Sequence, residues 1–230
     1  MAMVDKTTAM HDAIARIPDG ASVMLGGFGV PGTPFNLIKE LVRQGQKNLT
    51  IIKNDANETG MGVDWLLESG QIAKLVTSHI GLNPRAVRMM NAGDIDVEFA
   101  PQGILAERIR AAGAGLMGFV TDIGLGTDLA RGKAESTMDG KVGLLEPALH
   151  ADFALVHASK SDTFGNLIYA GTARNFNPLM AMAADFTIAE TETLLVPGEI
   201  QPDEIHTPAP FVDQVVAMSC VPEVYGVVRG

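Results

Sequence analysis

The residues best placed to do chemistry form a glycine-rich stretch that directly follows the apolar run Ser22 to Leu25. Glycine permits positive φ angles and close approach of the backbone, and the unpaired N–H groups at a helix start favour anions. We therefore predict a strand, a turn that contacts a ligand, and then a helix. The candidate binding residues of this turn, called the glycine loop below, are Gly26, Gly27, Phe28, Gly29, Val30, Pro31 and Gly32.

The residues after the glycine loop predict how the helix starts and leave the ligand open. Thr33 is expected to cap the helix and Pro34 to occupy its first position. Gly27 to Gly32 also satisfies G-x-G-x-x-G, and Asp55 stands roughly where a ribose-binding acid would, so a nicotinamide dinucleotide-binding oxidoreductase is one alternative. In that fingerprint the third glycine lies inside the helix, whereas Gly32 here precedes its start. A tight turn without a ligand is the other alternative.

A longer pattern around the loop adds a family resemblance. Asp19-Gly20 is followed by the three apolar residues Val23 to Leu25 and then by Gly26-Gly27-Phe28. Gly32 and Pro34 come after these at fixed offsets. This pattern resembles the signature of the first subunit of family I CoA-transferases, the 3-oxoacid and acetate/acetoacetate type. Four further blocks resemble the same family and extend it over nearly the whole chain: Ser78 to Gly81, Ala100 to Arg110, Gly113 to Thr127 and Ala173 to Pro178.

The resemblance implies a reaction and a partner. Such enzymes move CoA between an acyl-CoA and a carboxylate by a ping-pong route, in which a glutamate of a Glu-Asn-Gly motif in the second subunit becomes a glutamyl-CoA thioester. This chain contains no Glu-Asn-Gly. It is therefore expected to be an alpha subunit that carries half of an active site and needs a beta subunit, in an α2β2 or higher assembly. Coenzyme A would be a substrate, with no tightly bound cofactor.

The resemblance also assigns site residues. Gln102, between a predicted strand end and a helix start, matches an oxyanion-hole glutamine, although it could instead only cap that helix. Gly113 and Gly115 are expected to help close the acyl site. The glycine loop could contact CoA or the acyl group, and Arg174 could meet a carboxylate or form a structural salt bridge. The acyl donor and acceptor stay open, and a sugar-phosphate isomerase of the same fold is a further alternative.

Composition limits the class of protein. The 230 residues are 47% hydrophobic and 19% charged, as expected for one α/β domain over residues 1–230. A formal charge of −10 argues against nucleic acid and anionic membranes as partners. We expect no membrane span, no metal site, because the histidines are scattered, and a cytoplasmic location. The single cysteine, Cys220, is expected to be buried in an apolar strand.

The rest of the chain alternates predicted strands and helices. This pattern predicts an open, doubly wound, mostly parallel sheet, similar to sugar-phosphate isomerases and CoA-transferases, with ligands at the carboxyl ends of the strands. Asp139-Gly140 predicts the turn of a small β-hairpin inserted between residues 135 and 145. The glycine-rich segment from Gly113 to Gly132 is predicted to be a functional loop without regular elements.

Overall fold

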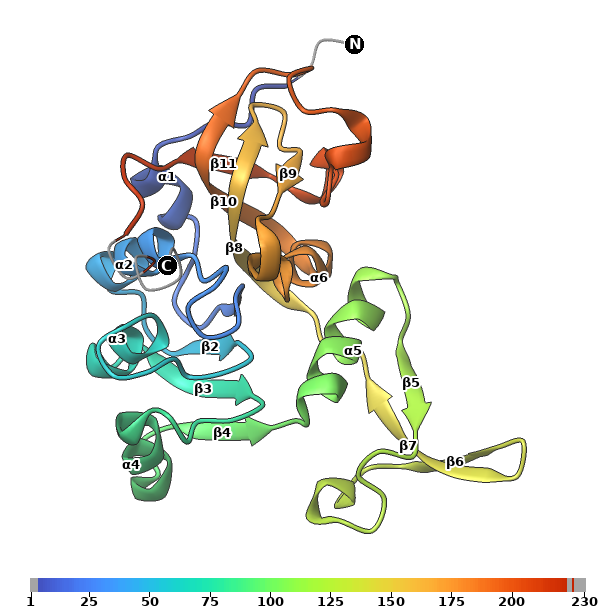
Figure 1. The fold of residues 1–230 in the computed structure, drawn as a ribbon. Coiled ribbons are helices and arrows are strands. Elements are labelled where there is room, and N and C mark those ends of the chain that lie inside the picture. The colour runs from blue at the N-terminus through green and yellow to red at the C-terminus, as the bar shows by residue number, and fades with distance from the viewer. Residues whose placement is uncertain (1–3, 223–224, 226–230) are drawn as a thin grey trace.

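A computed structural model of the chain describes residues 4–222 and residue 225 (Figure 1). Its largest element is an eight-stranded sheet with the order β11-β10-β8-β1-β2-β3-β4, and β9 pairs with β8 beside this path. Neighbouring strands along the path are parallel, whereas β9 is antiparallel to β8. The predicted doubly wound, mostly parallel α/β sheet is confirmed.

The elements lie close to the predicted ranges. The strands of the large sheet are β1 (Ser22–Leu25), β2 (Leu49–Ile52), β3 (Ile72–Thr77), β4 (Asp96–Phe99), β8 (Ala151–Asp162), β9 (Leu167–Ile168), β10 (Ala184–Leu195) and β11 (Gln214–Ala217). The α-helices are α1 (Met10–Ile14), α2 (Phe35–Gln44), α3 (Val63–Glu68), α4 (Pro84–Ala92), α5 (Gln102–Gly113) and α6 (Asn177–Ala183). Short 3-10 helices are η1 (Asp128–Ala130), η2 (Gly171–Arg174), η3 (Pro202–Glu204) and η4 (Ala209–Phe211).

Helices cover both faces of the sheet because its central strands are apolar on both sides. In β1, Val23 and Leu25 join one core, whereas Met24 joins the other. The first core is closed by α1 to α4, and the second is closed by α5 and α6 (Figure 1). Parallel strands that are buried on both faces have continuous hydrophobic sequences, as β1 does.

The order of the strands determines where a ligand can approach. From β1 the chain proceeds outward through β2 and β3 to β4, and it later returns to β8 on the other side of β1. The direction of winding therefore reverses between β1 and β8. Ligands of open α/β sheets bind outside the carboxyl ends of the strands at such a switch point. The glycine loop begins there, directly after Leu25.

A separate three-stranded antiparallel sheet has the order β5-β7-β6, with β5 (Gly118–Thr121), β6 (Glu135–Met138) and β7 (Lys141–Pro147). The predicted hairpin is β6–β7, whose turn residues Asp139 and Gly140 have φ angles of 49° and 74°. The prediction that Gly113 to Gly132 lacks regular elements was wrong, because β5 lies within it. Gly118 of β5 is needed for close pairing with β7, since a Cβ at this position would overlap the Glu146 carbonyl oxygen.

Two local predictions were also wrong. Thr33 does not cap α2: the cap position is Pro34, and the Thr33 hydroxyl donates to the Gly29 carbonyl oxygen at 2.7 Å instead. Cys220 is not in a buried strand, because β11 ends at Ala217 and Cys220 is exposed. The prediction of a single domain over residues 1–230 stays a prediction.

Candidate active site

The glycine loop continues β1 over the switch point of the sheet. The Gly26 N–H still donates to Leu155 of β8, at 2.9 Å. Beyond it the loop turns through positive φ angles at Gly27, Gly29 and Gly32, of 99°, 59° and 76°. Residues with a side chain rarely adopt such angles, so the glycines are what allow this backbone path.

One side of the loop is held by an amide on α6. The Asn177 side chain donates to the Gly32 carbonyl oxygen at 3.0 Å and accepts from the His157 N–H at 3.0 Å. A Cβ on Gly26 would overlap the Asn177 carboxamide oxygen, and one on Gly32 would overlap the Ala173 carbonyl oxygen. The loop therefore packs against this wall through bare backbone.

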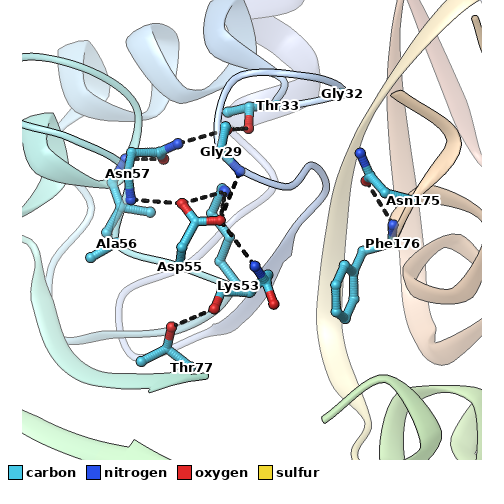
Figure 2. A network of polar contacts seen from close by, with 12 residues as sticks. Gly29, Gly32, Thr33, Lys53, Asp55, Ala56, Asn57, Thr77, Asn175 and Phe176 are labelled. Carbon is cyan, nitrogen blue, oxygen red and sulfur yellow. Dashed lines mark hydrogen bonds and ion pairs between the residues drawn. The ribbon is translucent and has the colours of Figure 1, made fainter. Parts of the chain in front are cut away.

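The other side is held by residues that follow β2 (Figure 2). The Gly29 N–H donates to the Asp55 carboxylate at 2.8 Å, and the Asn57 side-chain amide donates to the Gly29 carbonyl oxygen at 2.8 Å. The Asp55 carboxylate also accepts from the Asn57 N–H at 2.9 Å. Both polar groups of the Gly29 backbone are thus fixed by side chains.

A buried ion pair lies beneath this contact. Lys53 Nζ is 3.2 Å from both Asp55 carboxylate oxygens, and the Lys53 side chain is 0% exposed. Burial lowers the pKa of Lys53, and the Asp55 charge opposes that shift. Burial alone would raise the pKa of Asp55, but the Lys53 ammonium and the N–H donors of Gly29 and Asn57 hold it below its usual range. Asp55 therefore faces the loop as a carboxylate.

A second charged cluster lies on the β8 side. His157 Nδ1 is 2.9 Å from Glu190 on β10, and the other Glu190 oxygen accepts from the Leu37 N–H at 2.9 Å. Glu190 thus satisfies one of the unpaired donors at the start of α2, which explains why Thr33 is not needed there. His157 Nε2 is 3.3 Å from Glu192, and the Tyr225 ring lies against the imidazole with centroids 5.0 Å apart.

The loop separates two cavities. The smaller, of about 80 Å³, lies between the loop and the segments after β2 and β3. The larger, of about 370 Å³, lies between the loop and η2 and has a more polar lining. Its polar side chains are those of His157, Ser159, Thr172, Glu192 and Tyr225. In the part of the chain that the structure describes, no group of His, Cys, Asp and Glu side chains could hold a metal ion.

The chain is similar to known proteins of one family. Residues 7–218 match the family described as Coenzyme A transferase. The chain belongs to this family. It is 45% identical over 214 residues to the alpha chain of the acetate CoA-transferase of Escherichia coli K12, with 93% of this chain and 97% of that one covered. The corresponding chain of the 3-oxoadipate CoA-transferase of Acinetobacter baylyi is 43% identical over 227 residues, with 96% and 98% covered.

A solved structure agrees on the fold. An acyl-CoA transferase of Escherichia coli O157:H7, solved as a thioester complex with CoA, superposes with a TM-score of 0.83 at 22% identity. The match covers 96% of this chain and 51% of the other, so this chain spans about half of that protein. Since its relatives are single subunits of about this length, the chain is the alpha subunit of a two-subunit CoA-transferase.

The remaining predicted residues of this CoA-transferase subunit lie away from the loop. Gln102 is the first residue of α5 and follows the edge strand β4. Strand β4 lies three strand positions, and so roughly 14 Å, from β1. The Gln102 side chain is exposed, caps nothing and has no hydrogen-bond partner among the described residues. Gly113 and Gly115 lie at the opposite end of α5, where a Cβ on Gly113 would be 2.8 Å from Met182 of α6. Their role in closing the acyl site stays a prediction.

Other side chains are placed as follows. Arg174 is exposed at the end of η2 and forms no ion pair with a described residue. His79 follows β3, and its Nδ1 is 2.9 Å from the Ser78 hydroxyl. Sequence reasoning missed Lys53, Asn57 and Asn177 as residues that position the loop. A usable signal existed for the first two, because they belong to a polar run directly after the buried strand β2.

Proposed function

We propose that this subunit supplies the acyl-binding half of the active site of an acyl-CoA:carboxylate CoA-transferase. The observation that carries the proposal is the glycine loop, fixed over the switch point by Asp55 and Asn177 and bordered by a cavity on each side. The chain itself contains no Glu-Asn-Gly motif. The nucleophilic glutamate therefore comes from the beta subunit, in an α2β2 or higher assembly in the cytoplasm.

The reaction proceeds in two half-reactions. The partner's glutamate attacks the thioester carbonyl, and the C–S bond breaks to give an acyl-glutamyl anhydride and the CoA thiolate. The thiolate then attacks the glutamyl carbonyl, which forms the glutamyl-CoA thioester and releases the first carboxylate. An acceptor carboxylate reverses both steps and leaves as the new acyl-CoA. No bound cofactor takes part, because CoA is itself the group that is transferred.

Gln102 is proposed to donate a hydrogen bond to the carbonyl oxygen that becomes negative in these steps. Its amide has no partner among the described residues and stands at the start of α5, where backbone N–H groups also favour negative charge. A donor held at this oxygen in the assembled site would stabilise the transition state more than the ground state. The partner's glutamate would complete the site by lying against the same edge of the sheet.

The test uses this chain in complex with its beta subunit. Neither protein should be active by itself, and the complex should transfer CoA. After incubation with acyl-CoA and trapping of the thioester by reduction, peptide mass spectrometry should find the modified glutamate on the partner. A modified glutamate on this chain would overturn the assignment.

Gln102→Ala should lower kcat by roughly a hundred- to a thousand-fold with little change in KM for acyl-CoA. The control is Gln201→Ala, an exposed glutamine at the N-cap of η3, which should leave kcat unchanged. If Gln102→Ala retains near-normal kcat in an intact complex, the oxyanion donor lies elsewhere.

A further inference from the structure

The smaller cavity has a lining that distinguishes one class of acyl group from another. It lies beside Gly29 and the segment Asp55 to Asn57, which Figure 2 shows in contact with each other. Its apolar walls come from the glycine loop and from the segments that follow β2 and β3. They are Phe28, Val30, Ala56, Met61, Ile80 and Leu82.

We propose that this cavity receives the acyl end of the thioester and restricts the enzyme to short acyl groups without a terminal carboxylate. The inference rests on the proposed function and adds the substrate class to it. The two relatives compared above are named for different classes, acetate being a monocarboxylic acid and 3-oxoadipate a dicarboxylic acid. Both relatives are nearly equally identical to this chain, so identity does not distinguish the two classes of acid. The size and lining of the cavity do distinguish them.

Size gives the first argument. The cavity holds about 80 Å³, and a cavity of ~150 Å³ in another protein accommodates benzene, with its six carbons. By proportion, this space fits about three or four non-hydrogen atoms. A butyryl or acetoacetyl chain beyond its thioester carbonyl has this size. A 3-oxoadipyl chain, with several more atoms, would extend out of the cavity.

Charge gives the second argument. The carboxylates that line the cavity are Asp55 and Glu58, and no described lining residue is a lysine or an arginine. The nearby Lys53 is not part of the lining, because its ammonium lies behind, against Asp55. A terminal carboxylate of the substrate would lose water and face Glu58 without a lining cation to offset either charge, since the Lys53 ammonium is already paired with Asp55. That combination disfavours succinyl and 3-oxoadipyl groups.

One polar group of the lining is compatible with an uncharged acyl chain. The His79 ring lines the cavity, and its Nδ1 contacts the Ser78 hydroxyl at 2.9 Å. The other edge of the imidazole can meet a neutral carbonyl, such as the 3-oxo group of acetoacetyl-CoA. The cavity therefore accepts both plain and 3-oxo short chains, because neither brings a second charge.

The experiment compares kcat/KM of the assembled two-subunit enzyme for acetyl-, butyryl-, hexanoyl-, acetoacetyl- and succinyl-CoA. We expect butyryl- and acetoacetyl-CoA to exceed succinyl-CoA by at least about tenfold. Met61→Ala enlarges the cavity and should raise the hexanoyl-to-butyryl ratio of kcat/KM by roughly tenfold. Glu58→Arg supplies a cation and should raise the succinyl-to-butyryl ratio by a similar factor. The control Met138→Ala, on exposed β6, should change neither ratio.

The outcomes separate the two proposals. An active enzyme that prefers succinyl-CoA, or whose two ratios do not respond to Met61→Ala and Glu58→Arg, would overturn the inference and leave the transferase assignment standing. An assembled enzyme that transfers CoA from none of the five thioesters would overturn the proposed function itself. Selectivity for the short uncharged chains, moved in the stated directions by the two variants, would support the inference.

Discussion

The two sides of the glycine loop are held by different chemistry. On the side of β2 the contact includes a carboxylate, Asp55, paired with a fully buried lysine, Lys53, beside the amide of Asn57. On the side of α6 it is the neutral amide of Asn177, which is also fully buried. Both sides form hydrogen bonds to the loop backbone at about the same distances, 2.8 Å at Gly29 and 3.0 Å at Gly32.

This difference shows what each side contributes. Neutral amides can fix a backbone without the cost of removing charges from water. A buried ion pair carries that cost and often adds no stability over apolar residues of similar volume. We infer that the charged side is kept for what its carboxylate does at the smaller cavity: it fixes the Gly29 N–H and supplies a polar part of the lining. The amide side acts as a rigid wall.

The largest effect is expected from breaking the ion pair on one side only. Lys53→Met leaves Asp55 as a buried charge without its cation and should lower the free energy of unfolding by about 3–5 kcal/mol. The double variant Lys53→Met/Asp55→Asn should recover much of that loss. Urea denaturation measures both, with the exposed Lys160→Met as the control. Equal stability of the single variant and the wild type would show that the pair is not what holds this side.

A smaller effect is expected on the amide side. Asn177→Ala removes the hydrogen bonds that its side chain donates to the carbonyl oxygens of Gly32 and Ala173, and it leaves the buried His157 N–H without its acceptor, at a cost of about 1–3 kcal/mol. The same denaturation experiment checks it, with Asn91→Ala, an exposed asparagine of α4, expected to change little. No loss for Asn177→Ala would mean that packing of the glycines alone positions the loop.

The smallest effect on stability near neutral pH is expected from the titration of Asp55. Because the pKa of Asp55 is lower in the folded protein than its ordinary value of 3.8, its contribution to stability is complete above that value. It is lost as the pH falls through the lower, folded pKa. The difference in unfolding free energy between wild type and the Lys53→Met/Asp55→Asn variant, in which no unpaired buried lysine is left, should therefore shrink as the pH falls from about 5 into stronger acid. A difference that grows on acidification would contradict this sign.

Local rules predicted the elements well, and the exceptions have long-range causes. The β1 strand, the glycine turn and the Asp139-Gly140 hairpin follow from periodicity and turn chemistry. The cap of α2 could not be predicted, because the Leu37 N–H is satisfied by Glu190, 153 residues away. Strand β5 was hidden because glycine is a loop signal locally, although Gly118 is needed there for close pairing.

The site was predicted in part for the same reason. The loop is visible from sequence because its glycines are closely spaced, and its position at the switch point follows from the strand order. Its supports come from residues after β2 and from α6, which are distant in sequence. Asp55 was singled out only as a possible ribose ligand, whereas its carboxylate binds Gly29 and Lys53 within the chain. A polar run after a buried strand was the signal that could have indicated this role.

The central claim, that the glycine loop is where the acyl substrate approaches, is tested most directly by matched glycine variants. Gly29 and Gly45 have φ angles of 59° and 80°, and a Cβ would meet no atom within 4 Å at either position. Valine should therefore cost similar backbone strain at both, on the order of 1–2 kcal/mol. Only Gly29 lines a cavity beside the loop, whereas Gly45 ends α2.

The measurement is kcat/KM for butyryl-CoA of the two variants, each in complex with the beta subunit, together with their circular dichroism. We predict that Gly29→Val abolishes transfer while Gly45→Val retains it, with both variants folded and assembled. Full activity of Gly29→Val would contradict the account, because the loop would then be an ordinary turn without a ligand.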